Sequence, residues 1–233
     1  MSQIRWYFHT VWRILSSPTQ FFQSMPVAGG MSGPLAFALV THWVGSSIEF
    51  IWTAVFGIGA GTSFKKLMKL FIEKGGRWSG EEDYTYYYQK LPWIAEDDRL
   101  SDIYWGLGTI VLDPFSTVLS ILFTAFFVWL GARILVSPAR AGDLQEITFE
   151  SVVRVISYGL TPSLFLGLPL LGGMISSLYV LVITVIGVRE IYRVKPGRAL
   201  AIVLFPKLLF FGIISMGLIL IVFVFFKFMT SFM

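Results

Sequence analysis

Apolar residues run in long stretches along the chain, and their lengths predict helices that cross a membrane. A bilayer core of about 30 Å needs roughly 20 helical residues. Five stretches come close to this length, at about residues 34–56, 114–135, 147–166, 168–188 and 206–226. So few residues separate the third stretch from the fourth that these two must form an antiparallel hairpin. We therefore predict an all-α, polytopic membrane bundle of five transmembrane helices.

Proline residues give local signals for two of these helices. Asp113-Pro114 is a typical helix start, because an aspartate accepts free backbone N–H groups and proline suits the first turn. Asp113 is therefore interpreted as a helix cap. The last helix lies within residues 199–226, and Pro206 either kinks it or marks its beginning.

The N-terminal region, residues 1–33, has a different pattern. Its apolar side chains recur on one helical face, at Ile4, Phe8, Val11, Trp12 and Leu15. Basic residues interrupt the first 15 residues, and Ser17-Pro18 starts a second short helix. We predict an amphipathic segment in the membrane interface; the alternative is a helix that packs on the bundle.

The connection between the first two spans, residues 57–113, is long and polar. Apolar residues between Phe64 and Lys74 fall at helical spacing with lysines between them, which predicts a surface helix. This first loop is thus predicted to be a partly helical extramembrane segment, and the transmembrane domain to occupy residues 34–233.

Composition supports a membrane protein and excludes several chemistries. Apolar residues make up 55% and charged residues 14% of the chain, whereas soluble domains carry about 25% charged residues. The chain has no cysteine and two histidines, so neither a disulfide framework nor a cysteine or multi-histidine metal site is expected. Common nucleotide, zinc-protease and hydrolase motifs are missing, and we expect no cofactor and no nucleic-acid partner.

Basic residues in the short loops predict the orientation. They gather in the N-terminus and in the second and fourth loops, while the third loop is uncharged and the C-terminal end carries Lys227. Because Lys and Arg in short loops stay on the cytoplasmic side, we expect a cytoplasmic N-terminus and an external C-terminus.

One polar stripe interrupts the first span. His42, Gly45, Ser46, Glu49 and Thr53 fall on one face of the helix. An ionised Glu49 near the middle of a membrane costs about 2.5–3.5 kcal/mol, so the stripe should face the interior of the bundle. It is either a proton-linked or headgroup-binding cavity, or a structural group of hydrogen bonds with neighbouring helices.

Arg154 in the third predicted span is the candidate counter-ion of the stripe. Glu150 lies four residues earlier on the same helix, and a local Glu150–Arg154 pair is the simpler explanation of this charge.

Small residues on the last two helices allow close helix packing, within the chain or between two copies. The candidate packing positions are Gly172, Gly173, Gly212 and Gly217.

Several short motifs resemble bacterial proteins with the Yip (Ypt-interacting protein) domain. They are Ser17-Pro18-Thr19-Gln20-Phe21-Phe22, Gly29-Gly30, Gly33-Pro34-Leu35, the series Tyr158, Pro162, Pro169, Gly172-Gly173, Tyr179 and Gly187, and Arg198-Ala199-Leu200-Ala201 with Pro206. The resemblance implies a five-helix membrane domain with its N-terminus in the cytosol and no catalytic motif. Eukaryotic members associate with Rab-type GTPases, but this sequence lacks their long polar N-terminal region, which argues against GTPase binding.

We therefore expect a non-enzymatic membrane protein that organises membrane or partner proteins, in the bacterial cytoplasmic membrane. Its expected partners are the lipid bilayer and other membrane proteins or a second copy of itself. The alternative is a small transporter or lipid-translocating protein that uses the His/Glu stripe.

Overall fold

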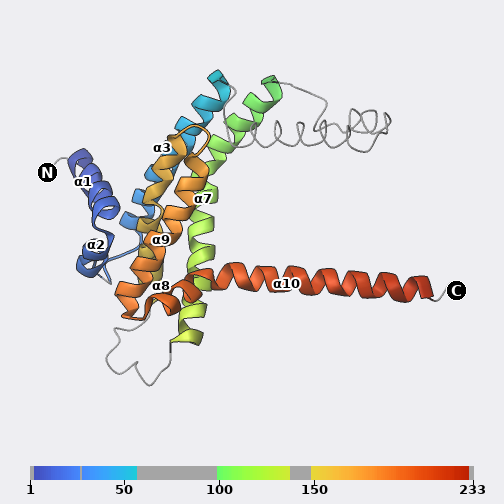
Figure 1. The fold of residues 1–233 in the computed structure, drawn as a ribbon. Helices are drawn as coiled ribbons and strands as arrows, with labels where there is room; N and C mark the ends of the chain where they lie inside the picture. Colours follow the sequence, from blue (N-terminus) through green and yellow to red (C-terminus); the bar gives the residue numbers. More distant parts are fainter. Residues whose placement is uncertain (1–2, 27, 57–98, 137–147, 231–233) are drawn as a thin grey trace. The chain divides into compact units, whose positions relative to one another are not determined.

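The structure is a computed structural model that describes residues 3–26, 28–56, 99–136 and 148–230. In these ranges every regular element is helical (Figure 1), as the sequence predicts. The elements are α1 (Gln3–Ser16), α2 (Pro18–Ser24), α3 (Ser32–Phe56), α7 (Arg99–Leu135), α8 (Phe149–Gly159), the 3₁₀ helix η2 (Thr161–Gly167), α9 (Gly172–Tyr192) and α10 (Pro196–Thr230). The predicted surface helix between Phe64 and Lys74 lies outside the described residues.

Four of the described helices are long and apolar enough to cross a membrane: Ser32–Trp52, Gly106–Leu135, Gly172–Tyr192 and Pro196–Ile221. This confirms a multi-pass membrane protein, but the predicted count of five spans is not confirmed. The predicted third span, 147–166, is divided between α8 and η2. Pro162 stands at the start of η2 and has no N–H to continue the α-helical ladder, which accounts for the change to 3₁₀ geometry.

The predicted start of the second span is wrong, and of the two alternatives for Pro206 the structure excludes a helix start there. Helix α7 begins at Arg99, so its first turns replace the end of the predicted extramembrane loop, and Pro114 lies inside it. Helix α10 begins at Pro196 and continues through Pro206.

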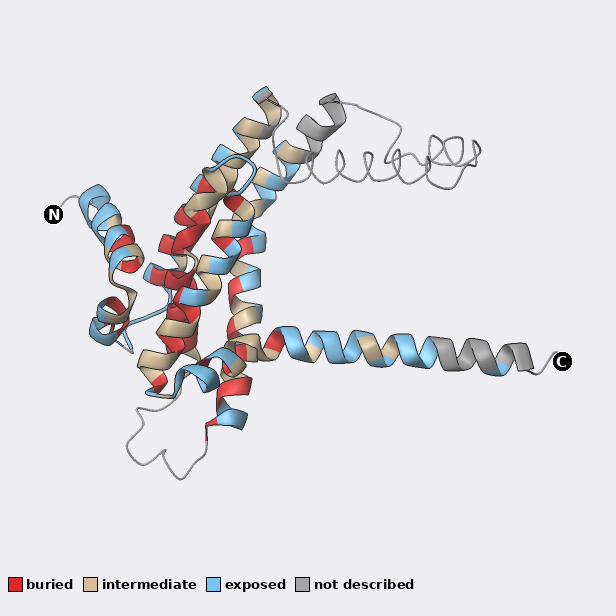
Figure 2. Cartoon of the chain, in the orientation of Figure 1, coloured by how far each residue is buried: buried red, intermediate tan, exposed pale blue. Residues whose placement is uncertain are grey.

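The chain forms two compact units, and α7 and α9 each contribute to both. The first unit comprises residues 1–34, 120–159 and 181–233. Helix α8 is its core, because every residue from Ser151 to Gly159 is buried (Figure 2). The antiparallel hairpin of α8 and α9 is confirmed: Gly187 lies against Val155, and Gly159 against Thr184.

An aromatic pair and a close contact between α7 and α10 also pack within this unit. The rings of Phe21 and Tyr158 meet edge to face with centroids 5.0 Å apart. Gly131 of α7 lies against Phe205 of α10, where an added Cβ would come within 2.9 Å of the ring. From Lys207 to Ile221, by contrast, α10 is exposed or half-exposed along its length.

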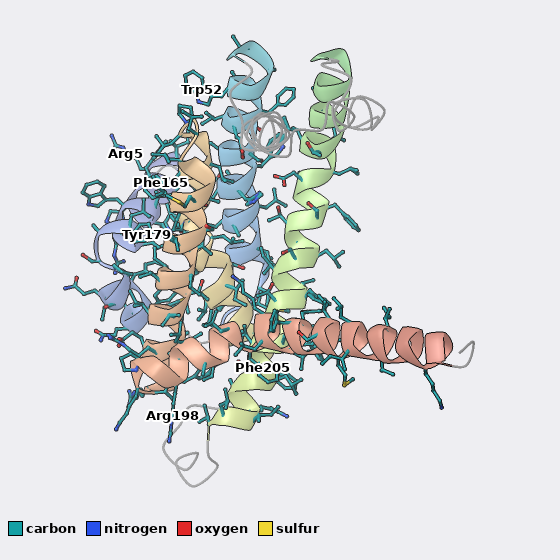
Figure 3. The ribbon with its side chains drawn as sticks, turned by 45° about the vertical axis from the view of Figure 1, so that its right-hand side comes forward. Arg5, Trp52, Phe165, Tyr179, Arg198 and Phe205 are labelled. Atoms are coloured by element: carbon teal, nitrogen blue, oxygen red, sulfur yellow. The ribbon has the colours of Figure 1, made fainter. Side chains whose placement is uncertain are left out.

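The second unit comprises residues 35–119 and 160–180. Gly45 of α3 touches the backbone carbonyl of Ser163 in η2 so closely that no Cβ fits there. Trp52 donates its indole N–H to the Gly167 carbonyl over 2.8 Å. The rings of Phe165 and Tyr179, labelled with Trp52 in Figure 3, join η2 to α9 with centroids 6.0 Å apart. These contacts hold α3, the helix that carries the polar stripe, in the second unit.

Candidate functional site: a polar clasp between α3 and α7

Two pairs of polar residues meet inside the second unit. Helix α3 carries His42 and Ser46 one turn apart, and α7 carries Asp113 and Thr117 one turn apart. Residues four apart lie on the same face of an α-helix, so each helix presents one pair to the other. We call these four residues the polar clasp.

The Asp113 carboxylate is the centre of the clasp. Its Oδ2 lies 3.0 Å from His42 Nδ1 and accepts a hydrogen bond from the Ser46 hydroxyl over 2.8 Å. The Thr117 hydroxyl lies 3.2 Å from the same His42 nitrogen. An ionised carboxylate at this distance requires a proton on Nδ1, because two acceptors would otherwise face each other. One carboxylate and one imidazole nitrogen thus connect all four residues of the clasp.

The clasp is shielded from solvent but not closed. The side chains of His42 and Asp113 keep 25% and 15% of their surface exposed, and Thr117 is buried. Hydrogen bonds between helices are the usual way to satisfy polar side chains where apolar surroundings offer no water. The arrangement can thus join α3 to α7 through side-chain hydrogen bonds.

A proline next to the clasp explains a further contact. Pro114 has no N–H, so the carbonyl four residues earlier, that of Ile110, loses its helical partner. Trp43 of α3 donates its indole N–H to this carbonyl over 3.2 Å. The defect in α7 is therefore repaired from α3, one residue away from His42.

The structure brings only part of the predicted stripe together. His42 and Ser46 belong to the clasp, while Gly45 contacts η2. Glu49 is half-buried further along α3, and the side chain of Thr53 lies outside the described residues.

Arg154 belongs to the first unit, not to the unit of the stripe. Its guanidinium lies 3.4 Å from Glu150 Oε1, so the predicted local pair is present. It also donates to the Gly30 carbonyl over 3.5 Å, while Glu150 accepts the Gly30 N–H over 2.7 Å. This charge therefore fastens the N-terminal segment to α8.

The interpretation of Asp113 as a helix cap is wrong, and Thr117 was not identified from the sequence. Asp113 lies inside α7, where its carboxylate is free to bond to another helix. The available signal was spacing, because His42/Ser46 and Asp113/Thr117 repeat the same four-residue interval on two apolar helices.

Of the candidate packing glycines, Gly172 makes a close contact within the chain, with the Phe165 and Leu166 carbonyls. Gly173, Gly212 and Gly217 have open space where a Cβ would stand. Among the residues that the structure describes, no cluster of three or more His, Asp or Glu side chains could hold a metal ion.

Comparison with known proteins identifies a family. The model of the Yip1 domain matches residues 12–219, a range that includes every residue of the polar clasp. Searches of curated proteins and of solved structures gave no match.

Proposed function

Because the chain belongs to the Yip1 domain family, we propose that it is a non-enzymatic integral membrane protein that organises membrane or partner proteins. The supporting observation is the polar clasp. The Asp113 carboxylate contacts the polar groups of both His42 and Ser46. These two stripe residues therefore have a structural role, because they join α3 to α7.

We place this protein in the bacterial cytoplasmic membrane with its N-terminus in the cytoplasm. A fifth crossing is proposed at residues 147–166, which supply roughly the 20 residues that a bilayer core needs. The burial of α8, which lies within this range, supports a crossing that is surrounded by other parts of its unit.

The second candidate function is transport, and the observation that favours it is the His42–Asp113 pair itself. An imidazole beside a carboxylate in an apolar helix pair can carry a proton, and both side chains retain some exposure. A transporter would use this pair in its cycle, whereas an organising protein would use it only to hold two helices together.

Proton flux distinguishes the two functions. The full chain is reconstituted into vesicles that contain the pH-sensitive dye pyranine, and a pH gradient is applied with potassium and valinomycin to clamp the membrane potential. We expect the same dye response as in protein-free vesicles, for the wild type and for Asp113→Asn. Flux that the wild type supports and Asp113→Asn loses would contradict the proposal and favour transport.

Photo-crosslinking tests the organising function directly. A benzophenone amino acid at Phe211, which is 72% exposed on α10, reports what covers this helix in the membrane. Discrete protein adducts, either with a second copy or with another membrane protein, are expected. Adducts with lipid alone at Phe211 and at Leu208, another exposed position on the same helix, would count against a partner on α10.

A further inference from the structure

Helix α1 exposes a ridge of large apolar side chains. Ile4, Phe8 and Trp12 follow one another at intervals of four residues and are 70%, 65% and 71% exposed. Side chains at this spacing lie on one face of a helix. We call these three residues the α1 ridge; the exposure of α1 is visible in Figure 2.

Another face of α1 packs on the protein. Thr10, Val11 and Ile14 are buried, and Ile14 has no exposed surface. Val11 therefore differs from the sequence-based expectation, which placed it on the same face as Phe8 and Trp12. The buried face fixes the rotation of the helix. The α1 ridge therefore lies on a different side of α1 from the face that the protein covers.

Basic side chains border the α1 ridge. Arg5, labelled in Figure 3, and His9 are exposed and lie one turn apart beside it. Arg13 is held by the hydroxyl of Ser24 over 3.0 Å and lies over the Phe21 ring. Helix α1 contains no acidic residue, so its charge is of one sign.

Hydrogen bonds from the N-terminal segment hold α1 to its unit. The Gly30 N–H donates to Glu150, and the Gln23 amide donates to Glu190 of α9 over 2.8 Å. Gly29 and Gly30 both have positive φ angles, which favour glycine. The α1 ridge is therefore presented by a folded segment and needs little ordering when it meets a partner.

We propose that α1 lies along the surface of an anionic membrane, with the α1 ridge among the acyl chains and Arg5 and His9 against the headgroup phosphates. The 14 residues of α1 extend about 21 Å, too short to cross the bilayer core. A helix with an apolar face and a basic border binds at this boundary. A second copy of the chain is a poorer occupant, because two identical basic borders would repel each other.

Spin labelling tests this proposal, because the chain contains no cysteine. Single labels are placed by Phe8→Cys and, as the control at another exposed position of α1, by Ser16→Cys. The full chain is studied in nanodiscs of phosphatidylcholine with phosphatidylglycerol. Collisions with oxygen report acyl-chain depth, and collisions with a water-soluble nickel chelate report exposure to solvent. We expect a several-fold higher oxygen-to-nickel ratio at residue 8 than at residue 16, and the same high ratio for Ile4→Cys.

Three results would overturn the proposal. A label at residue 8 that collides mainly with nickel would place the α1 ridge in water. A label protected from both reagents would place another protein on it. An unchanged oxygen-to-nickel ratio after Arg5→Gln with His9→Gln, or in nanodiscs of phosphatidylcholine alone, would remove the role of anionic headgroups. These readouts do not depend on the polar clasp, so they can fail while the proposed function holds.

Discussion

Trp43 donates its indole N–H to the backbone carbonyl of Ile110, which Pro114 leaves without a helical partner. A proline inside a helix removes one hydrogen bond and strains the preceding turn. Here the neighbouring helix supplies the missing donor. The carbonyl that Pro114 leaves free thus accepts a hydrogen bond that joins α3 to α7 beside the polar clasp.

Replacing Trp43 by Phe should destabilise the fold through the loss of this bond. One hydrogen bond contributes about 0.5–1.5 kcal/mol to the free energy of unfolding. The measurement is the unfolding of the purified protein in detergent by a chemical denaturant. In a Pro114→Ala background the helix regains its own N–H donor, so Trp43→Phe should lower the free energy of unfolding by less. An equal loss in both backgrounds would show that Trp43 does not compensate for Pro114.

A methyl group at Gly45 should separate α3 from η2. Because the position meets the Ser163 backbone carbonyl, Gly45→Ala forces the two elements apart and should lower the free energy of unfolding by about 1–3 kcal/mol. The matched control is Gly212→Ala, also in a helix but with open space around it. The control should be neutral or slightly stabilising, because alanine favours helix. Similar losses for both variants would argue against the close contact at Gly45.

The position of the two chain ends distinguishes four crossings from five, since an odd number of crossings places them on opposite sides. Single cysteines at Ser2 and Ser231 are labelled in intact cells with a membrane-impermeant maleimide. The proposed five crossings with a cytoplasmic N-terminus predict label on residue 231 only. Label on both residues or on neither would leave only the four long apolar helices as crossings. Label on residue 2 alone would reverse the orientation.

The sequence predicts the helical class and the long apolar helices because hydropathy over about 20 residues depends little on tertiary contacts. It misplaces the start of α7 because Asp113-Pro114 normally begins a helix. The contact that compensates for Pro114 inside α7 comes from Trp43, which is 67 residues from its acceptor Ile110 in the chain. The break between α8 and η2 has a local signal in Thr161-Pro162, because proline has no N–H to continue an α-helix.

Only one half of the candidate site, the pair on α3, was predicted from the sequence. His42 and Ser46 stand out because they are polar in an apolar helix, but the partners of a polar residue depend on which helices are neighbours. The four-residue spacing of Asp113 and Thr117 offered a signal, but their pairing with His42 required the placement of α3 beside α7. For Arg154 the local partner Glu150 was predictable because it lies one turn away on the same helix.

A double-mutant cycle on His42 and Asp113 tests most directly whether the polar clasp joins two helices. The free energy of unfolding is measured for the wild type, His42→Ala, Asp113→Ala and the double variant. For helix-to-helix hydrogen bonds in membranes, the coupling is about 0.6 kcal/mol and reaches about 1.7 kcal/mol. As a control, Asp113→Ala combined with Ser177→Ala, whose hydroxyl donates to Met174 within α9, should show no coupling. We predict a favourable His42–Asp113 coupling in this range; a value no larger than that of the control pair would contradict the clasp.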